Sequence, residues 1–174
     1  MIPCSDNVIP RGFLDRHHGF MTNATLSQFP NRPSRALHLV DLENLAATAW
    51  LSQQVARRTA AEYLALAQFE VGDLIVVASS HRNGLAARAA FPGATVRWRS
   101  GRDGADLALL DAYSEFDHSR FNRLMVGSGD GIFSGLVASA RQGGLVVSVV
   151  TRRHSASATL IDSASTVALI GQAA

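Results

Sequence analysis

Three acidic side chains stand next to short apolar segments of the sequence. Asp41 directly follows the segment at residues 37–40, and Asp130 comes soon after the segment at residues 124–126. Asp106 begins an alanine- and leucine-rich stretch. If the apolar segments are parallel strands, their carboxyl ends meet at one edge of a sheet, which is where open α/β sheets place their functional residues. We therefore expect the three carboxylates to converge.

Each of these acids has a simpler interpretation when taken alone, because aspartate at a strand end or in a first helical turn often caps a helix by accepting backbone N–H bonds. Several carboxylates at adjacent strand ends, however, repel one another unless a cation, a proton or an arginine offsets their charge. Oxygen ligands are the choice of hard cations. The cluster therefore predicts a site for Mg²⁺ or Mn²⁺ held by Asp41, Asp106 and Asp130.

Arginine surrounds these acids in the predicted loops. The arginines that follow predicted strands are Arg82, Arg99, Arg102, Arg152 and Arg153. Guanidinium groups bind phosphate in a bidentate manner, so a cation-holding centre ringed by arginine suits a phosphodiester better than a neutral substrate. The formal net charge is only +2. Any nucleic-acid site must therefore come from such local clustering.

Several other kinds of chemistry are excluded by residue type. All 16 basic side chains are arginine, and the absence of lysine excludes Walker-type phosphate loops, Schiff-base enzymes and lysine-assisted aspartyl phosphotransferases. The glycine-rich segment at residues 127–131 lacks the third glycine of a dinucleotide-binding loop, and Ser128 lacks the glycines of a nucleophile elbow. The single cysteine, Cys4, excludes a disulfide framework and a multi-cysteine zinc site. We expect no dinucleotide cofactor.

The elements that must position these residues follow from the hydrophobic pattern. We predict strands at residues 37–40, 74–78, 95–99, 124–126 and 145–150. We predict helices at residues 46–68, 83–90, 105–115 and 131–142, a last helix near 157–163 and a short closing segment at 167–170. Continuous apolar strands need cover on both faces. The expected fold is a three-layer α/β/α sandwich with a mostly parallel, doubly wound sheet of about five strands.

Two residues inside predicted strands have structural interpretations. His38 is expected to be a core residue whose ring nitrogens are hydrogen-bonded, and Trp98 is expected to lie in the core and not to stack on a base. Arg97 and Arg99 alternate with Trp98, so the alternative role for these two arginines is to protect the edge of the sheet.

The length and composition describe one globular domain. The chain has 174 residues, of which 47% are hydrophobic and 17% charged, and this is enough apolar material for one core. Residues 1–34 are expected to form an irregular tail that folding does not require, and residues 35–174 the domain. No segment is long and apolar enough for a signal peptide or a membrane span, so we expect a cytoplasmic protein without membrane contact.

Three ordered segments resemble the motifs of the NYN group of the PIN-like nuclease superfamily. They are Val40-Asp41-Leu42-Glu43-Asn44, the stretch Gly-Ala-Asp-Leu-Ala-Leu-Leu-Asp at 104–111, and Ser128-Gly129-Asp130-Gly131-Ile132-Phe133. The resemblance covers about residues 37–170. It implies a PIN-like fold and metal-dependent endonuclease chemistry on RNA. It also implies that Asp41, Asp106 and Asp130 are the catalytic acids and that Asn44 assists them.

The chain departs from the family pattern at Ile132, where a second aspartate is common, and at Ala164-Ser165, where Ala-Asp is usual. Asp111 lies five positions after Asp106, about 140° around a helix, so we expect Asp111 to support the site and not to bind the same ion. Ser128 is expected to bond a neighbouring carboxylate or the scissile phosphate.

The favoured interpretation is a metal-dependent endoribonuclease. The alternative is a catalytically weak or inactive RNA-binding or regulatory module on the same fold, which the reduced number of acids keeps open. A small nucleotide-binding protein fits less well, because its phosphate loop is absent. Homo-oligomerisation and the choice between RNA and DNA also stay open.

Overall fold

The computed structural model describes residues 34–171. The predicted N-terminal tail lies outside this range except for Ser34, and so does Cys4. The strands are β1 Ala36–Asp41, β2 Leu74–Ser79, β3 Thr95–Trp98, β4 Arg123–Gly127, β5 Val146–Thr151 and β6 Thr166–Leu169. The helices are α1 Leu42–Ala46, α2 Gln53–Leu66, α3 Gly84–Ala90, α4 Gly104–Glu115, α5 Ser134–Gln142 and α6 Ala158–Ser163.

The strands of the described residues form one parallel sheet in the order β3-β2-β1-β4-β5-β6. The predicted parallel, doubly wound sheet is confirmed, with six strands where about five were expected. The sixth is the predicted closing segment, which pairs with β5. The chain runs outward from β1 to β3 on one side and from β4 to β6 on the other. The order therefore reverses between β1 and β4, and such a switch point is where ligands bind in open α/β sheets.

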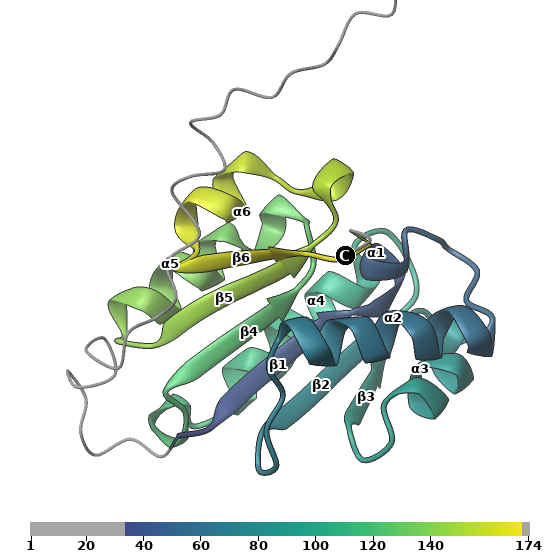
Figure 1. Ribbon diagram of the computed structural model, residues 1–174, viewed down its shortest axis with the longest axis horizontal. Coiled ribbons are helices and arrows are strands. Elements are labelled where there is room, and N and C mark those ends of the chain that lie inside the picture. Colours follow the sequence, from purple (N-terminus) through teal and green to yellow (C-terminus); the bar gives the residue numbers. More distant parts are fainter. Residues whose placement is uncertain (1–33, 172–174) are drawn as a thin grey trace, which may run out of the picture.

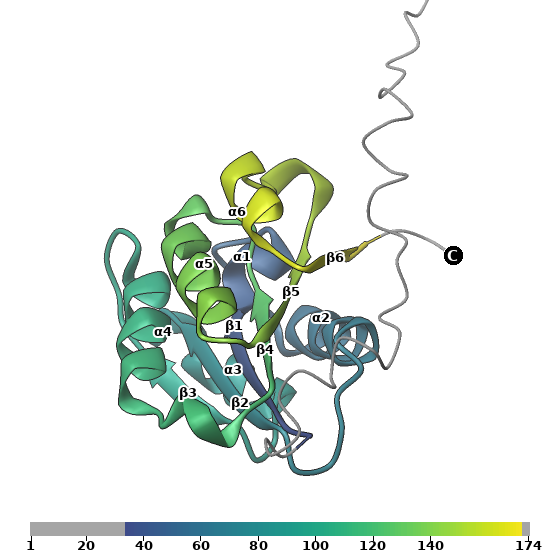
Figure 2. The same ribbon diagram turned by 90° about the vertical axis from the view of Figure 1, so that its left-hand side faces the viewer.

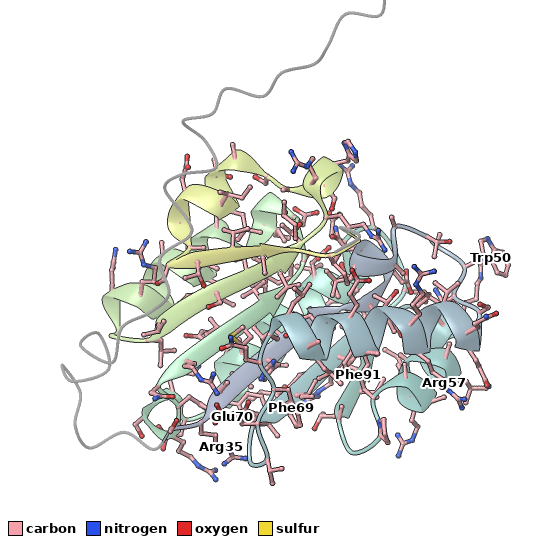
Figure 3. All side chains as sticks on the ribbon, viewed as in Figure 1. Arg35, Trp50, Arg57, Phe69, Glu70 and Phe91 are labelled. Atoms are coloured by element: carbon pink, nitrogen blue, oxygen red, sulfur yellow. The ribbon has the colours of Figure 1, made fainter. Side chains whose placement is uncertain are left out.

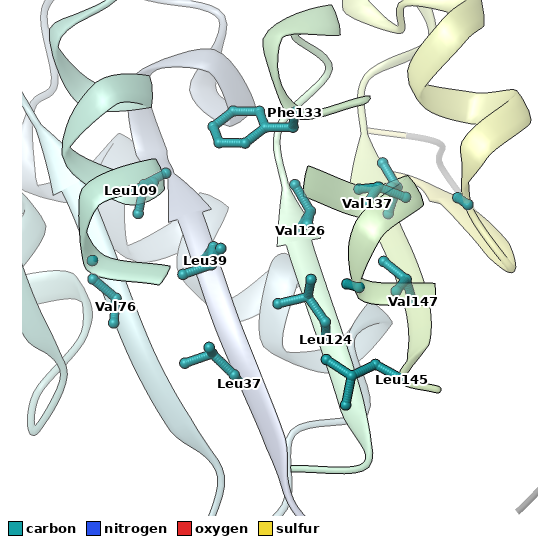
Figure 4. Packing of buried hydrophobic residues seen from close by; sticks show 14 of the residues in the cluster. Leu37, Leu39, Val76, Leu109, Leu124, Val126, Phe133, Val137, Leu145 and Val147 are labelled. Carbon is teal, nitrogen blue, oxygen red and sulfur yellow. The ribbon is translucent and has the colours of Figure 1, made fainter. Parts of the chain in front are cut away.

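Helices cover both faces of the sheet, as the continuous apolar strands require (Figures 1 and 2). Helices α4, α5 and α6 pack on one face, and α1, α2 and α3 on the other. Every residue of β1 is buried, and its side chains alternate between the two cores. Figure 4 shows Leu37 and Leu39 of β1 packed among residues of α4, β4 and α5.

The second core contains a buried polar group on β1. His38 is fully buried, with Nδ1 3.0 Å from the Tyr63 hydroxyl and Nε2 3.2 Å from Oδ2 of Asp73. Burial lowers the pKa of His38, and the hydrogen bond to Asp73 partly opposes this shift. The prediction that His38 is a hydrogen-bonded core residue is confirmed.

Two local predictions were wrong. The segment 46–68 is not one helix: Ala47 has a left-handed φ of 52° and ends α1, and the Ser52 hydroxyl accepts a hydrogen bond from the Val55 N–H at 3.2 Å to begin α2. Trp98 is 48% exposed and not in the core, because β3 is an edge strand of the sheet. The edge position of this strand agrees with the alternative role of its arginines. None of the helices at residues 34–171 is long and apolar enough to cross a membrane.

Candidate active site

Two of the predicted acids lie at the carboxyl ends of neighbouring strands. Asp41 ends β1, and its Oδ1 accepts hydrogen bonds from the backbone N–H groups of Glu43 and Asn44, both at 3.1 Å. Asp130 follows β4, and its Oδ1 accepts from the Ile132 N–H at 2.9 Å. Both are thus N-caps at the switch point of the sheet. These two aspartates therefore cap helical turns and also lie close to the same end of the sheet.

Asp106, in the first turn of α4, completes the group. It is 7% exposed and Asp41 is 5% exposed. Burial raises the pKa of Asp41 to about 7, and the charge of Asp106 and a hydrogen bond between the two carboxyl groups add to this effect. Burial also raises the pKa of Asp106, and the charge of Asp130 adds to it. The fold therefore brings Asp41 and Asp106 into contact and places Asp130 within electrostatic reach.

The contact between Asp41 and Asp106 leaves one buried carboxyl oxygen unpaired. Oδ1 of Asp106 is buried and has no hydrogen-bond partner, and an unpaired buried acceptor costs free energy. Within the described range, no group of three or more His, Cys, Asp or Glu side chains is arranged to hold a metal ion. Asp130 is exposed and turned toward its cap. The donors that face inward are oxygens of Asp41 and Asp106, which suit Mg²⁺ or Mn²⁺.

Asn44 and Ser128 hold the loop that carries Asp130. The side-chain oxygen of Asn44 accepts a hydrogen bond from the Gly129 N–H at 2.9 Å, which ties α1 to the end of β4. Ser128 is fully buried, and its Oγ accepts from the Asp130 N–H at 3.2 Å. Gly129 has no room for a side chain, since a Cβ there would lie 2.2 Å from the carbonyl oxygen of Ser155. These contacts fix the backbone between β4 and Asp130.

Sequence reasoning did not identify Glu43 and Asn83 as residues that build the site. Oε1 of Glu43 accepts from the Ser80 N–H at 2.7 Å and from Nδ2 of Asn83 at 2.8 Å. The loop after β2 is therefore fastened to α1 right beside Asp41. The signal for Glu43 was its place inside the segment that resembles the family motif, whereas Asn83 had no sequence signal of its own.

The five predicted phosphate-binding arginines have different surroundings. Arg82 stacks over the ring of Trp50, 3.8 Å from its centroid. Arg99 pairs with Asp111 at 2.9 Å on the exposed side of α4, so Asp111 faces Arg99. Arg102 is exposed, with Asp103 3.7 Å away, and Arg153 is exposed too.

Among the five arginines, Arg152 forms a hydrogen bond to the backbone of another element. Its Nε donates to the carbonyl oxygen of Leu45 and so joins the end of β5 to α1. This contact gives Arg152 a structural role at the rim of the site.

Comparison with known proteins shows a similarity of fold. No family model matches the chain, and no curated protein matches it. A crystal structure of a protein of unknown function from Vibrio parahaemolyticus is similar, with a TM-score of 0.59 and 22% identity. The match covers 82% of this chain and 96% of that one. The similarity supports the α/β architecture described above.

Proposed function

We propose that the protein is a metal-dependent endonuclease of the PIN-like, NYN type that acts on RNA. The observation that carries this proposal is the buried contact between Asp41 and Asp106, with an unpartnered oxygen on Asp106 and Asp130 nearby. Two carboxyl groups pressed together at a switch point are costly to a fold. Such a cost is commonly maintained at functional sites.

Asp41 and Asp106 would hold Mg²⁺ or Mn²⁺, with Asp130 completing the ligands by turning from its cap. When bound, such a cation supplies charge stabilisation for a phosphoryl oxygen and lowers the pKa of a water molecule at the scissile phosphate. Asn44 keeps the loop of Asp130 against α1. Ser128 orients the backbone of Asp130.

Phosphate binding falls to the arginines outside the acids. Arg82 and Arg153 are exposed and form no ion pair within residues 34–171. Their guanidinium groups are therefore open to phosphate oxygens. Arg99 and Arg102 would bind phosphate only after releasing their acidic partners, Asp111 and Asp103. The lone cysteine agrees with a reducing compartment, so we place this activity in the cytoplasm.

The second candidate function is an RNA-binding module that has lost catalysis. Ile132 favours it, because an apolar residue that is 37% exposed stands where the family commonly has a second aspartate. With fewer carboxylates the site would hold one cation in place of two.

The test compares cleavage with binding on the same labelled single-stranded RNA. Asp41→Asn, Asp106→Asn and Asp130→Asn are each expected to lower Mn²⁺-dependent cleavage at least about a hundredfold. RNA binding should be kept or tightened, because each change removes a charge that repels phosphate. Asp162→Asn is the matched control, since Asp162 is an exposed aspartate on α6. It should cleave like the wild type.

The contradicting result is equally plain. If the wild-type protein binds the RNA but shows no Mn²⁺-dependent cleavage that Asp106→Asn removes, the RNA-binding module replaces the nuclease.

A further inference from the structure

An aromatic and cationic surface lies on the β2–β3 side of the molecule, apart from the acids. Trp50 is 69% exposed and Trp98 is 48% exposed. Arg82 lies over the ring of Trp50. We call these three residues the tryptophan platform. An exposed tryptophan is unusual, because its large ring gains much from burial.

Trp50 is held outward by a dedicated set of hydrogen bonds. Asn83 is 2% exposed, and its amide takes up the backbone on both sides of Trp50: Nδ2 donates to the Ala49 carbonyl at 3.0 Å, and Oδ1 accepts from the Leu51 N–H at 3.1 Å. The Thr48 hydroxyl bonds both the N–H and the carbonyl of Trp50, each at 3.2 Å. Figure 3 shows Trp50 at the outer edge of the molecule, near the start of α2. The fold thus presents this ring to solvent.

Trp98 contacts the same short segment that carries Arg82. Its indole lies so close to Gly84 that a Cβ on that glycine would be 2.7 Å from Nε1. Next to it, the His81 N–H and ring nitrogen both bond the Ser100 hydroxyl, at 3.2 and 2.9 Å. Both tryptophans therefore contact the short segment 81–84, Trp50 through Arg82 and Trp98 through Gly84.

The charge around the platform is positive over a long part of the chain. Residues 44–61 and 74–102 contain no aspartate or glutamate. They contain seven arginines: Arg57, Arg58, Arg82, Arg88, Arg97, Arg99 and Arg102. Within the part of the chain that the structure describes, the first four of these form no ion pair, whereas Arg97, Arg99 and Arg102 pair with Glu115, Asp111 and Asp103. The unpaired arginines of this part of the chain, Arg82 on the platform among them, supply the positive charge that a polyanion needs.

We propose that the tryptophan platform binds single-stranded RNA, with bases stacked on Trp50 and Trp98 and phosphates held by the neighbouring arginines. Aromatic rings that stack bases, set in a cationic groove, are the general means of binding single strands. A duplex hides its base faces and offers nothing to these rings. The platform is fastened to α1 through the bond between Asn83 and Glu43. In the proposed nuclease, a strand stacked on Trp50 would continue toward Asp41.

This inference rests on the proposed function for the choice of RNA and for the direction of the strand. The test, however, measures binding without cleavage. Trp50 and Trp98 are the two tryptophans of the chain, so the intrinsic tryptophan fluorescence comes from the platform alone. Titration with an oligouridylate of about ten nucleotides in the presence of a chelator should quench it. The matching RNA duplex and an abasic oligomer of equal charge should bind at least about tenfold more weakly.

Variants assign the effect to single residues. Trp50→Leu should weaken binding of the oligouridylate about tenfold, while Trp50→Phe keeps most of the affinity because a phenyl ring still stacks. Trp98→Leu should act in the same direction. Arg82→Ala should weaken binding and reduce the salt dependence by about one phosphate contact. Arg120→Ala is its matched control, because Arg120 is exposed just before the amino end of the central strand β4, whereas Arg82 follows the carboxyl end of β2.

Two results would overturn the platform: an abasic oligomer that binds as tightly as the oligouridylate, or leucine variants that bind like the wild type. The two proposals fail separately. Quenching by single strands without Mn²⁺-dependent cleavage would leave the platform standing and reject the nuclease. Cleavage that the tryptophan variants do not change, with no quenching, would do the reverse.

Discussion

Asp41 carries two roles that depend on different states of the same carboxyl group. As the N-cap of α1 it accepts two backbone hydrogen bonds, which favour the ionised form. Burial and the contact with Asp106 favour the protonated form, and they raise its pKa to about 7. A divalent cation would resolve the conflict, because it stabilises both carboxylates in the ionised form at once.

The substitution Asp41→Asn tests this conflict in metal-free protein. Asparagine keeps the cap and removes the titrating group. The folded pKa of Asp41, about 7, lies above its ordinary value of 3.8, so the folded state binds more protons between these values. Aspartate therefore costs stability that grows as the pH rises from about 4 to 7 and is constant above 7. We expect Asp41→Asn to raise the free energy of unfolding by about 2 to 4 kcal/mol at pH 8.

Denaturant unfolding in a chelator at pH 5 and pH 8 is the measurement. The gain should be smaller at pH 5 than at pH 8. Asp162→Asn, at an exposed position, should show neither the gain nor its pH dependence. A lower free energy of unfolding for Asp41→Asn at pH 8 would contradict this prediction, because it would mean that the Asp41 carboxylate stabilises the folded state.

At the scale of the elements, the loop from β4 to α5 is the part of the site with the least freedom. Its backbone passes between the side-chain oxygen of Asn44 and the backbone of Ser155. The Gly129 carbonyl also accepts from the Ser157 N–H at 2.8 Å. The loop thus joins α1, β4 and the start of α6.

Gly129→Ala tests this packing. A Cβ at this position would meet the Ser155 carbonyl oxygen at 2.2 Å and the Thr151 hydroxyl at 2.5 Å. Because one of these is backbone, relief requires the loop to move, and we expect a loss of about 1 to 3 kcal/mol in thermal or denaturant unfolding. Gly135→Ala is the control, as it lies in α5 with open space around it. The free energy of unfolding of Gly135→Ala should rise by about 0.5 to 1 kcal/mol. Equal behaviour of the two variants would contradict the close packing at Gly129.

Most of the strands were predictable because they are short and mainly aliphatic, whereas β3 (Thr95–Trp98) alternates apolar and polar residues as an edge strand does. The positions of Asp41 and Asp130 at strand ends followed from parallel topology. The break between α1 and α2 was not seen, because alanine-rich composition favours helix throughout 46–68. Ser52 was a usable cap signal there. The backbone of Ala47 in the left-handed region had no signal in its residue type.

The tertiary contacts around the site could not be predicted from the sequence. The ion pair between Arg99 and Asp111 does not follow from residue spacing in the sequence, and neither does the hydrogen bond from Arg152 to the Leu45 carbonyl. Each contact depends on how a helix packs on the sheet. The exposure of Trp50 likewise follows from Asn83, which lies far from it in the chain.

At the scale of the whole molecule, arginines and acids are distributed unevenly along the chain. Residues 74–102, which include β2 and β3, contain arginine and no acid. The acids Asp103, Asp106, Asp111 and Glu115 lie on and before α4, where Glu115 pairs with Arg97 and Asp111 with Arg99. The candidate active site lies at the reversal of strand order. In the proposed function, the unpaired arginines would attract a polyanion while the acids would hold a cation.

The proposed function depends on a divalent cation site formed by Asp41 and Asp106. The most direct measurement is thermal unfolding of the wild type, Asp106→Asn and Asp162→Asn with and without saturating Mn²⁺. Binding to the folded state alone stabilises it, by about 2.7 kcal/mol at a hundredfold excess over Kd. We predict that Mn²⁺ raises the unfolding midpoint of the wild type and of Asp162→Asn and leaves that of Asp106→Asn unchanged. An unchanged midpoint in the wild type, or an equal rise in all three proteins, would contradict the site.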